Sequence, residues 1–177
     1  MKNSHGKLPA CQKANCLRWK NDKYFCNSVP VEMNTQDLEI AKKRLNENRL
    51  TLSIVKNGEI IFETVSNGIS GFLEAIEKFG NMLEGTSVAD RVAGKAIALL
   101  CVYAKVEAVY ALILSKGAKS VFEKYEIRHE WKELVENILD VKKAGICPFE
   151  KLATEISNSK DAYRKFKALQ NSLKHGR

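Results

Sequence analysis

Two short apolar runs separated by a turn give the clearest pattern in the sequence. Residues 50–55 (LTLSIV) and 60–65 (IIFETV) are rich in the β-branched and aromatic residues that are typical of strands. Between them lies the segment KNGE at residues 56–59. Its Asn-Gly pair readily adopts the positive φ angles that a tight turn requires. We therefore predict a β-hairpin over residues 50–65.

Apolar residues at helical spacing predict helices on both sides of this hairpin. Upstream, Asn34 or Thr35 can cap a helix that carries apolar residues at positions 38, 41 and 45 and ends near residue 48. Downstream, apolar residues at positions 72, 73, 76 and 79 predict a short amphipathic helix that Gly80 ends.

The segment 88–103 is apolar on nearly every side, which predicts a central, buried helix. Ser87 can cap this helix, and Asp90 then lies in its first turn, where a carboxylate meets the positive end of the helix dipole. Residues 107–114 follow as an apolar run without polar alternation, which predicts an interior strand covered on both faces.

The remaining elements continue the alternation of helices and strands. Residues 117–125 predict a helix, residues 127–129 a short strand, and residues 131–139 a further helix with Trp131, Leu134, Val135 and Ile138 facing inward. Strands alternating with helices form a sheet with helices packed on its faces. We therefore predict an α/β fold, a three-layer sandwich.

Charge divides the chain into three parts. The net charge is +8; residues 1–33 carry six basic and two acidic residues, residues 151–177 seven and two, and the middle 16 and 17. We predict a cysteine-bearing basic leader over residues 1–33, an α/β domain over 34–150, and a basic amphipathic C-terminal helix over 151–177. Basic ends can attract nucleic acid, although a solubilising extension is the commoner role.

No window approaches the ~18 apolar residues of a membrane span, and the first residues lack the pattern of a secretory signal. We expect a cytoplasmic protein. The five cysteines form an odd set without a pairing scheme, as is typical of a reducing compartment, so disulfides are not predicted.

Two segments carry a resemblance to a known family. Residues 87–96 (SVADRVAGKA) and 145–150 (GICPFE) resemble the two signature segments of a prokaryotic domain family of unknown function with the cytidine-deaminase-like fold. The resemblance covers residues 38–150. It departs at residues 140–144 (DVKKA), where an Asn-Arg-Asp-like segment is expected. The resemblance implies that the sandwich is of the cytidine-deaminase-like type.

Zinc deaminases place His-x-Glu at the start of one helix and Pro-Cys-x-x-Cys at the start of the next. At the places that the resemblance indicates, this sequence has Val88-Ala89-Asp90 and Ser115-Lys116-Gly117-Ala118. Without an imidazole or paired thiolates there, zinc cannot be held in the usual way. Zinc-dependent deamination is therefore not expected, and neither is a cofactor in the body.

Five residues are candidate ligand-binding residues. Asp90 either caps a helix or accepts a hydrogen bond from a ligand, and Lys95 either reaches solvent or meets an anion in a cleft. Gly94 permits the close approach of another group. Cys147 precedes Pro148 and is predicted at a helix N-cap, where a thiol becomes more acidic, with Glu150 three residues on.

The leader offers a candidate metal site. His5, Cys11, Cys16 and Cys26 are ligand types that can hold one tetrahedral zinc ion, although the spacing lacks a Cys-x-x-Cys knuckle. A bound structural zinc would give this polar leader a reason to fold. Scattered free thiols are the alternative.

We expect a deaminase-like domain without zinc catalysis that binds a small nucleotide-like or anionic ligand. Two alternatives remain open: an enzyme of different chemistry that uses Asp90, Lys95 or Cys147, and a nucleic-acid-associated protein that acts through its basic tails. A homo-oligomer is also open. The C-terminal stripe of Tyr163, Phe166, Leu169 and Leu173 is predicted to dock on the body or on a second subunit.

Overall fold

A computed structural model describes the backbone of residues 16–19, 23–26 and 31–175, and the side chains of residues 35–174. The chain forms two compact units, Met1–Val31 and Glu32–Arg177. In the first unit, strands β1 (Cys16–Trp19) and β2 (Lys23–Cys26) pair antiparallel. The helix predicted over residues 151–177 belongs to the second unit.

The predicted hairpin is confirmed. Strands β3 (Leu52–Lys56) and β4 (Glu59–Thr64) pair antiparallel across a two-residue turn, in which Asn57 has a φ of 54° and Gly58 a φ of 79°. Helix α1 (Val31–Glu47) supports the turn, because the Asp37 carboxylate accepts hydrogen bonds from the backbone N–H groups of Asn57 (2.8 Å) and Gly58 (2.6 Å).

The second unit is built on one five-stranded mixed sheet in the order β4-β3-β5-β6-β7. Strands β5, β6 and β7 run parallel, and β3 runs antiparallel to β5. The remaining elements, in chain order, are α2 (Ser70–Phe79), the 3₁₀ helix η1 (Gly80–Leu83), β5 (Ser87–Ala93), α3 (Lys95–Ala104), β6 (Ala108–Ser115), α4 (Lys116–Lys124), β7 (Arg128–Val135), α5 (Pro148–Thr154) and α6 (Ser159–His175).

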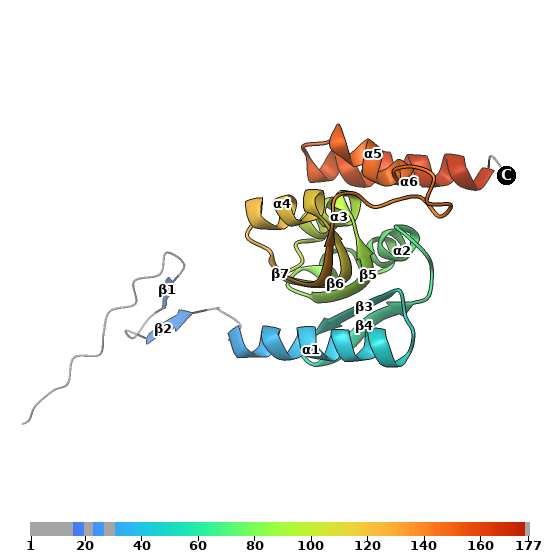
Figure 1. Ribbon diagram of the computed structural model, residues 1–177. Coiled ribbons are helices and arrows are strands. Elements are labelled where there is room, and N and C mark those ends of the chain that lie inside the picture. The colour runs from blue at the N-terminus through green and yellow to red at the C-terminus, as the bar shows by residue number, and fades with distance from the viewer. Residues whose placement is uncertain (1–15, 20–22, 27–30, 176–177) are drawn as a thin grey trace, which may run out of the picture. The chain divides into compact units, whose positions relative to one another are not determined.

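Helices cover both faces of this sheet (Figure 1). Helix α1 lies on one face, and its Ala41 and Leu45 pack with Leu50, Val55 and Ala89. Helices α2, α3 and α4 lie on the other face, with α5 and α6 stacked outside them. The predicted α/β sandwich is therefore confirmed, with an additional outer layer formed by the C-terminal helices.

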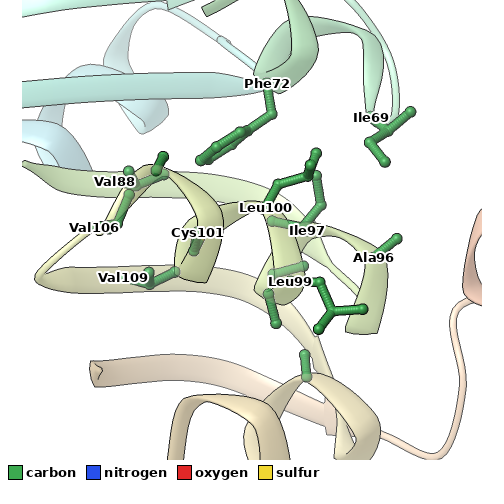
Figure 2. Packing of buried hydrophobic residues seen from close by; sticks show 14 of the residues in the cluster. Ile69, Phe72, Val88, Ala96, Ile97, Leu99, Leu100, Cys101, Val106 and Val109 are labelled. Carbon is green, nitrogen blue, oxygen red and sulfur yellow. The ribbon is translucent and has the colours of Figure 1, made fainter. Parts of the chain in front are cut away.

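The main core centres on α3. Its residues from Ala96 to Cys101 are buried, and Figure 2 shows their side chains leaving the helix on several sides, with Phe72 and Val88 in the same cluster. Helix α6 packs on this helix and contributes the fully buried Phe166, while Leu169 is partly buried. Burial of a phenylalanine side chain stabilises the fold by about 1.5–3 kcal/mol, so α6 is integral to the unit.

The predicted helix over residues 88–103 is wrong in its first half. Ser87–Ala93 forms β5, and α3 begins only at Lys95, after Gly94 at the N-cap. Asp90 therefore lies in a strand and not in the first turn of a helix. An interior parallel strand followed by a buried helix is apolar on all sides in both elements, so the pattern carries no period that separates them.

The predicted helix over residues 131–139 is also wrong. Strand β7 continues to Val135, and the chain then forms a turn in which Leu139 bridges to Ile146. Trp131 and Leu134, predicted to face inward, are 38% and 39% exposed. Their helical spacing misled because β7 is an edge strand, whose apolar residues need not follow a strict alternation.

Candidate functional site

The three parallel strands of the sheet end at one edge, where three helices begin or pass. Helix α3 begins directly after β5, and α4 directly after β6. In open α/β sheets, ligands bind beyond the carboxyl ends of the strands. The side chains at this edge are therefore the first candidates for a functional site.

A buried carboxylate joins the starts of three helices at this edge. Glu150, in the first turn of α5, is 4% exposed and accepts a hydrogen bond of 2.7 Å from the Ser115 hydroxyl. Ser115 is the N-cap of α4, and its oxygen in turn accepts the N–H of Ala118 (3.1 Å). The positive ends of the helix dipoles favour a negative charge at this place.

Gly94, the N-cap of α3, makes room for this carboxylate. A Cβ atom at Gly94 would lie 2.9 Å from the Glu150 Cδ atom and 3.0 Å from the Ile138 Cγ1 atom. The backbone of Gly94 (φ −90°, ψ 178°) is open to any residue, so the close contact alone explains the glycine. Gly94 and Glu150, both predicted site residues, thus meet each other.

A cavity of about 380 Å³ opens beside this edge, between α3, α4 and the connection from α5 to α6. Lys95, the first residue of α3, lines it, and Gly117 accommodates the stem of Lys95: a Cβ at Gly117 would lie 3.3 Å from the Lys95 Cβ atom. The other lining residues are Leu99, Ser120, Val121, Lys124, Tyr125, Thr154, Glu155, Ile156 and Ser157.

The cavity wall carries more positive than negative charge. Lys95 and Lys124 line it together with one carboxylate, that of Glu155. Among the residues with described side chains, neither lysine forms an ion pair, although the Lys124 ammonium lies 5.4 Å from the centre of the Tyr125 ring. An unpaired cation at a cavity attracts anions.

Asp90 lies away from this cavity. Its side chain is 8% exposed and accepts a hydrogen bond of 2.9 Å from the backbone N–H of Val92. Burial raises the pKa of Asp90 to about 7, against the opposing effect of backbone N–H groups. Asp90 is not among the residues that line the cavity with Lys95, so the two do not form one site.

Cys147 occupies the N-cap of α5, as predicted, with Pro148 at the first helical position. Its thiol is partly buried and makes no capping hydrogen bond. The backbone N–H of Cys147 donates to the Ile138 carbonyl (2.9 Å), while Glu150 turns to Ser115. The structure therefore brings Gly94 and Glu150 together and places Lys95 at the cavity beside them, whereas Asp90 and Cys147 do not line this cavity.

The predicted metal ligands of the leader are described only in part. Cys16 and Cys26 are register partners in the β1–β2 hairpin, and His5 and Cys11 lie outside the described residues. Among the side chains that the structure does describe, no three His, Cys, Asp or Glu residues gather as a metal site would require.

Sequence reasoning missed Ser115, Lys124 and the hydroxyl residues at the end of α5. Ser115 could have been found, because a strand that ends in serine before a helix is a typical N-cap signal. Lys124, Thr154 and Ser157 meet at the cavity because α4 and α5 both pack on α3, and no local sequence pattern indicates this arrangement.

The model of a domain of unknown function, DUF1893, matches residues 40–171. The chain belongs to the DUF1893 family. Among solved structures, a DUF1893 family protein (TM1506) from Thermotoga maritima is 28% identical and superposes with a TM-score of 0.70, covering 75% of this chain and 89% of that protein. Membership of DUF1893 thus spans the sheet and most of the helices.

RibD from Acinetobacter baumannii is 19% identical, covers 70% of this chain and 36% of RibD, and has a TM-score of 0.38. A TM-score of 0.38 is too low to support a conclusion about the fold or function of this DUF1893 protein. No curated protein matches the chain. Within residues 31–175, no helix combines the length and apolar character needed to cross a bilayer.

Proposed function

We propose that the chain binds a small anionic ligand of nucleotide type in the cavity beside Lys95. The observation that carries this proposal is the pair of lysines, Lys95 and Lys124, which line the cavity and form no ion pair among the residues described there. A lysine stem held against Gly117 costs conformational entropy, and contact with an anion would compensate for it.

The rest of the wall suits such a ligand. The hydroxyl groups of Ser120, Thr154 and Ser157 can bond phosphate or ribose oxygens, and the Tyr125 ring with Leu99 and Ile156 offers an apolar surface for a base. The volume of about 380 Å³ falls within the range of small-molecule pockets, ~300–1,000 Å³. We infer binding and not catalysis, because Asp90 and Cys147 do not converge on this wall.

The interpretation of the domain as deaminase-like agrees with this proposal, but the proposal does not depend on it. The order of hairpin, helix, strand, helix and strand is that of the cytidine-deaminase-like fold, and the residues at the starts of α3 and α4 are Gly94-Lys95-Ala96 and Ser115-Lys116-Gly117-Ala118. These segments contain no histidine or cysteine, so we propose a ligand site that works without zinc.

Thermal unfolding in the presence of adenosine monophosphate, adenosine and inorganic phosphate tests the proposal. Adenosine monophosphate should raise the melting temperature, because a ligand that binds only the native state stabilises it. The substitution Lys95→Met should abolish the shift. Lys116→Met is the matched control, since Lys116 begins the neighbouring helix but pairs with Glu136 (2.6 Å). An unchanged shift in Lys95→Met, or no shift with any of the three compounds, would refute the proposal.

A further inference from the structure

Strand β7 is the last strand of the five-stranded sheet, and no strand among the described residues pairs with its outer edge. Most of its residues are exposed, including Trp131 at 38% and Leu134 at 39%. Trp131 is nevertheless held in place, because its ring stacks on that of His129 (5.5 Å between centres) and the Lys119 ammonium lies 5.7 Å from its centre. An exposed edge with a fixed aromatic residue is suited to pair with another strand.

The backbone of β7 determines which residues can make that pairing. The Arg128 N–H donates to the Glu107 carbonyl (3.1 Å), so Arg128 directs its backbone groups toward β6. Because these directions alternate along a strand and the β6–β7 register is continuous, Glu130 and Lys132 also point inward. His129, Trp131 and Glu133 therefore present their N–H and C=O groups to the outside.

Charge selects one register for pairing with a second copy. In an antiparallel pair, outward-facing residues must lie opposite one another, so a two-fold axis near the middle of β7 falls at residue 130, 131 or 132. An axis at Glu130 places Glu130 opposite itself, and an axis at Lys132 places Lys132 opposite itself. An axis at Trp131 instead places Lys132 opposite Glu130 and Glu133 opposite His129, twice each.

We propose that a second copy of this chain pairs its β7 antiparallel with β7 of the first, centred on Trp131, and joins the two five-stranded sheets into one. The side chains favour this register. Lys132 and Glu133 have no ion-pair partner among the described side chains, while Lys42 and Arg128 hold Glu130 (both 2.9 Å). The same charges that repel strands in other registers become complementary in this one.

Disulfide trapping tests the register. In the proposed dimer the two copies of residue 131 lie opposite one another, with Cα atoms about 5.5 Å apart, which a disulfide can span. Under oxidised glutathione, Trp131→Cys should form a reducible dimer beyond the wild-type level. Lys132→Cys is the matched control, because it faces Glu130 of the second copy and should stay monomeric in denaturing gels. Crosslinking of Lys132→Cys but not of Trp131→Cys would overturn the proposed register.

Sedimentation equilibrium of the full chain tests the association itself. Lys132→Glu replaces two attractive contacts with Glu130 by two repulsive ones, so the dimer should dissociate at least ~10-fold more readily. Lys165→Glu makes the same change of charge on the exposed face of α6 and should leave the dissociation constant unchanged. A wild-type chain that is monomeric at about 100 μM, or equal effects of the two substitutions, would overturn the proposal.

Discussion

Replacing Gly94 by alanine tests whether the Glu150 carboxylate determines the packing at the carboxyl edge of the sheet. The added Cβ would lie 2.9 Å from the Glu150 Cδ atom, well inside van der Waals contact. The backbone angles of Gly94 suit alanine, so strain in the backbone adds nothing. Overpacking of a buried site costs about 1–3 kcal/mol, and we expect Gly94→Ala to lower the free energy of unfolding by that amount.

The companion variant Glu150→Ala removes the obstacle. Alone it leaves the buried Ser115 hydroxyl without its acceptor and opens a void, which together cost about 2–4 kcal/mol. In the Glu150→Ala background, Gly94→Ala should cost only about 1 kcal/mol or less, because the loss of a better N-cap residue is partly offset by the restriction that alanine places on the unfolded chain. The coupling free energy between the two sites should therefore be about 1–3 kcal/mol.

Equilibrium unfolding in urea of the wild type, the two single variants and the double variant measures this coupling. The slope with denaturant should stay the same in all four proteins if the transition remains two-state. Equal costs of Gly94→Ala in both backgrounds would refute the reasoning. In that case Ile138, whose Cγ1 atom would lie 3.0 Å from the new Cβ, would be the group that excludes a side chain.

Two further predictions concern acidity and metal. The pKa of Asp90, raised to about 7, exceeds its value of 3.8 in an unfolded chain, so the native state binds the extra proton and loses stability as the pH rises between these values. The free energy of unfolding of Asp90→Asn, measured in urea, should therefore rise by about 2–3 kcal/mol relative to that of the wild type as the pH increases from 5 to 8. Parallel pH profiles of the two proteins would contradict this prediction. We also predict that elemental analysis finds no zinc in a chain trimmed to begin at Asn34. Stoichiometric zinc in that trimmed chain would contradict the prediction and show that the body holds metal ligands.

The sequence predicted those elements whose signals are local. Asn57 and Gly58 specify their turn by themselves, because both adopt the positive φ angles that this residue pair favours. Gly80 ends α2 in the same way, with a φ of 49°. The helix over residues 159–175 was also predictable, since its apolar residues recur on one face and Phe166 is buried by the packing of α6 on α3.

The wrong predictions share one physical cause. The tertiary structure determines which residues are buried, so the local spacing of apolar residues does not distinguish a strand from a helix there. Most of residues 87–104 are buried, first in a strand and then in a helix, and Gly94 marks the boundary between the two elements. Its cost in a helix interior was itself a signal that the helix begins later. The sequence of β7 beyond residue 130 predicted a helix because this exposed edge strand carries apolar residues on both faces of the sheet, without the alternation typical of a strand.

The sequence identified several residues of the candidate site but not the contacts between them. Gly94, Lys95 and Glu150 were identified from the sequence, yet Glu150 bonds a serine 35 residues away that was not. The spacing of Asp90 and Lys95 gave no warning that a strand end separates them. Contacts between these distant segments depend on how α4 and α5 each pack on α3, and no periodic pattern in a single sequence indicates them.

The Glu150 carboxylate occupies the place at the sheet edge where an anion from solution would otherwise bind. A free anion that approached the starts of α3 and α4 would have to displace the Glu150 carboxylate, which the α5 helix holds there at a high effective local concentration. Displacement would also lift α5 from α3, against which it packs. An anion from solution can therefore bind at the starts of α3 and α4 only if the outer layer of α5 and α6 opens. The cavity beside Lys95, in contrast, can bind a ligand while this layer stays closed.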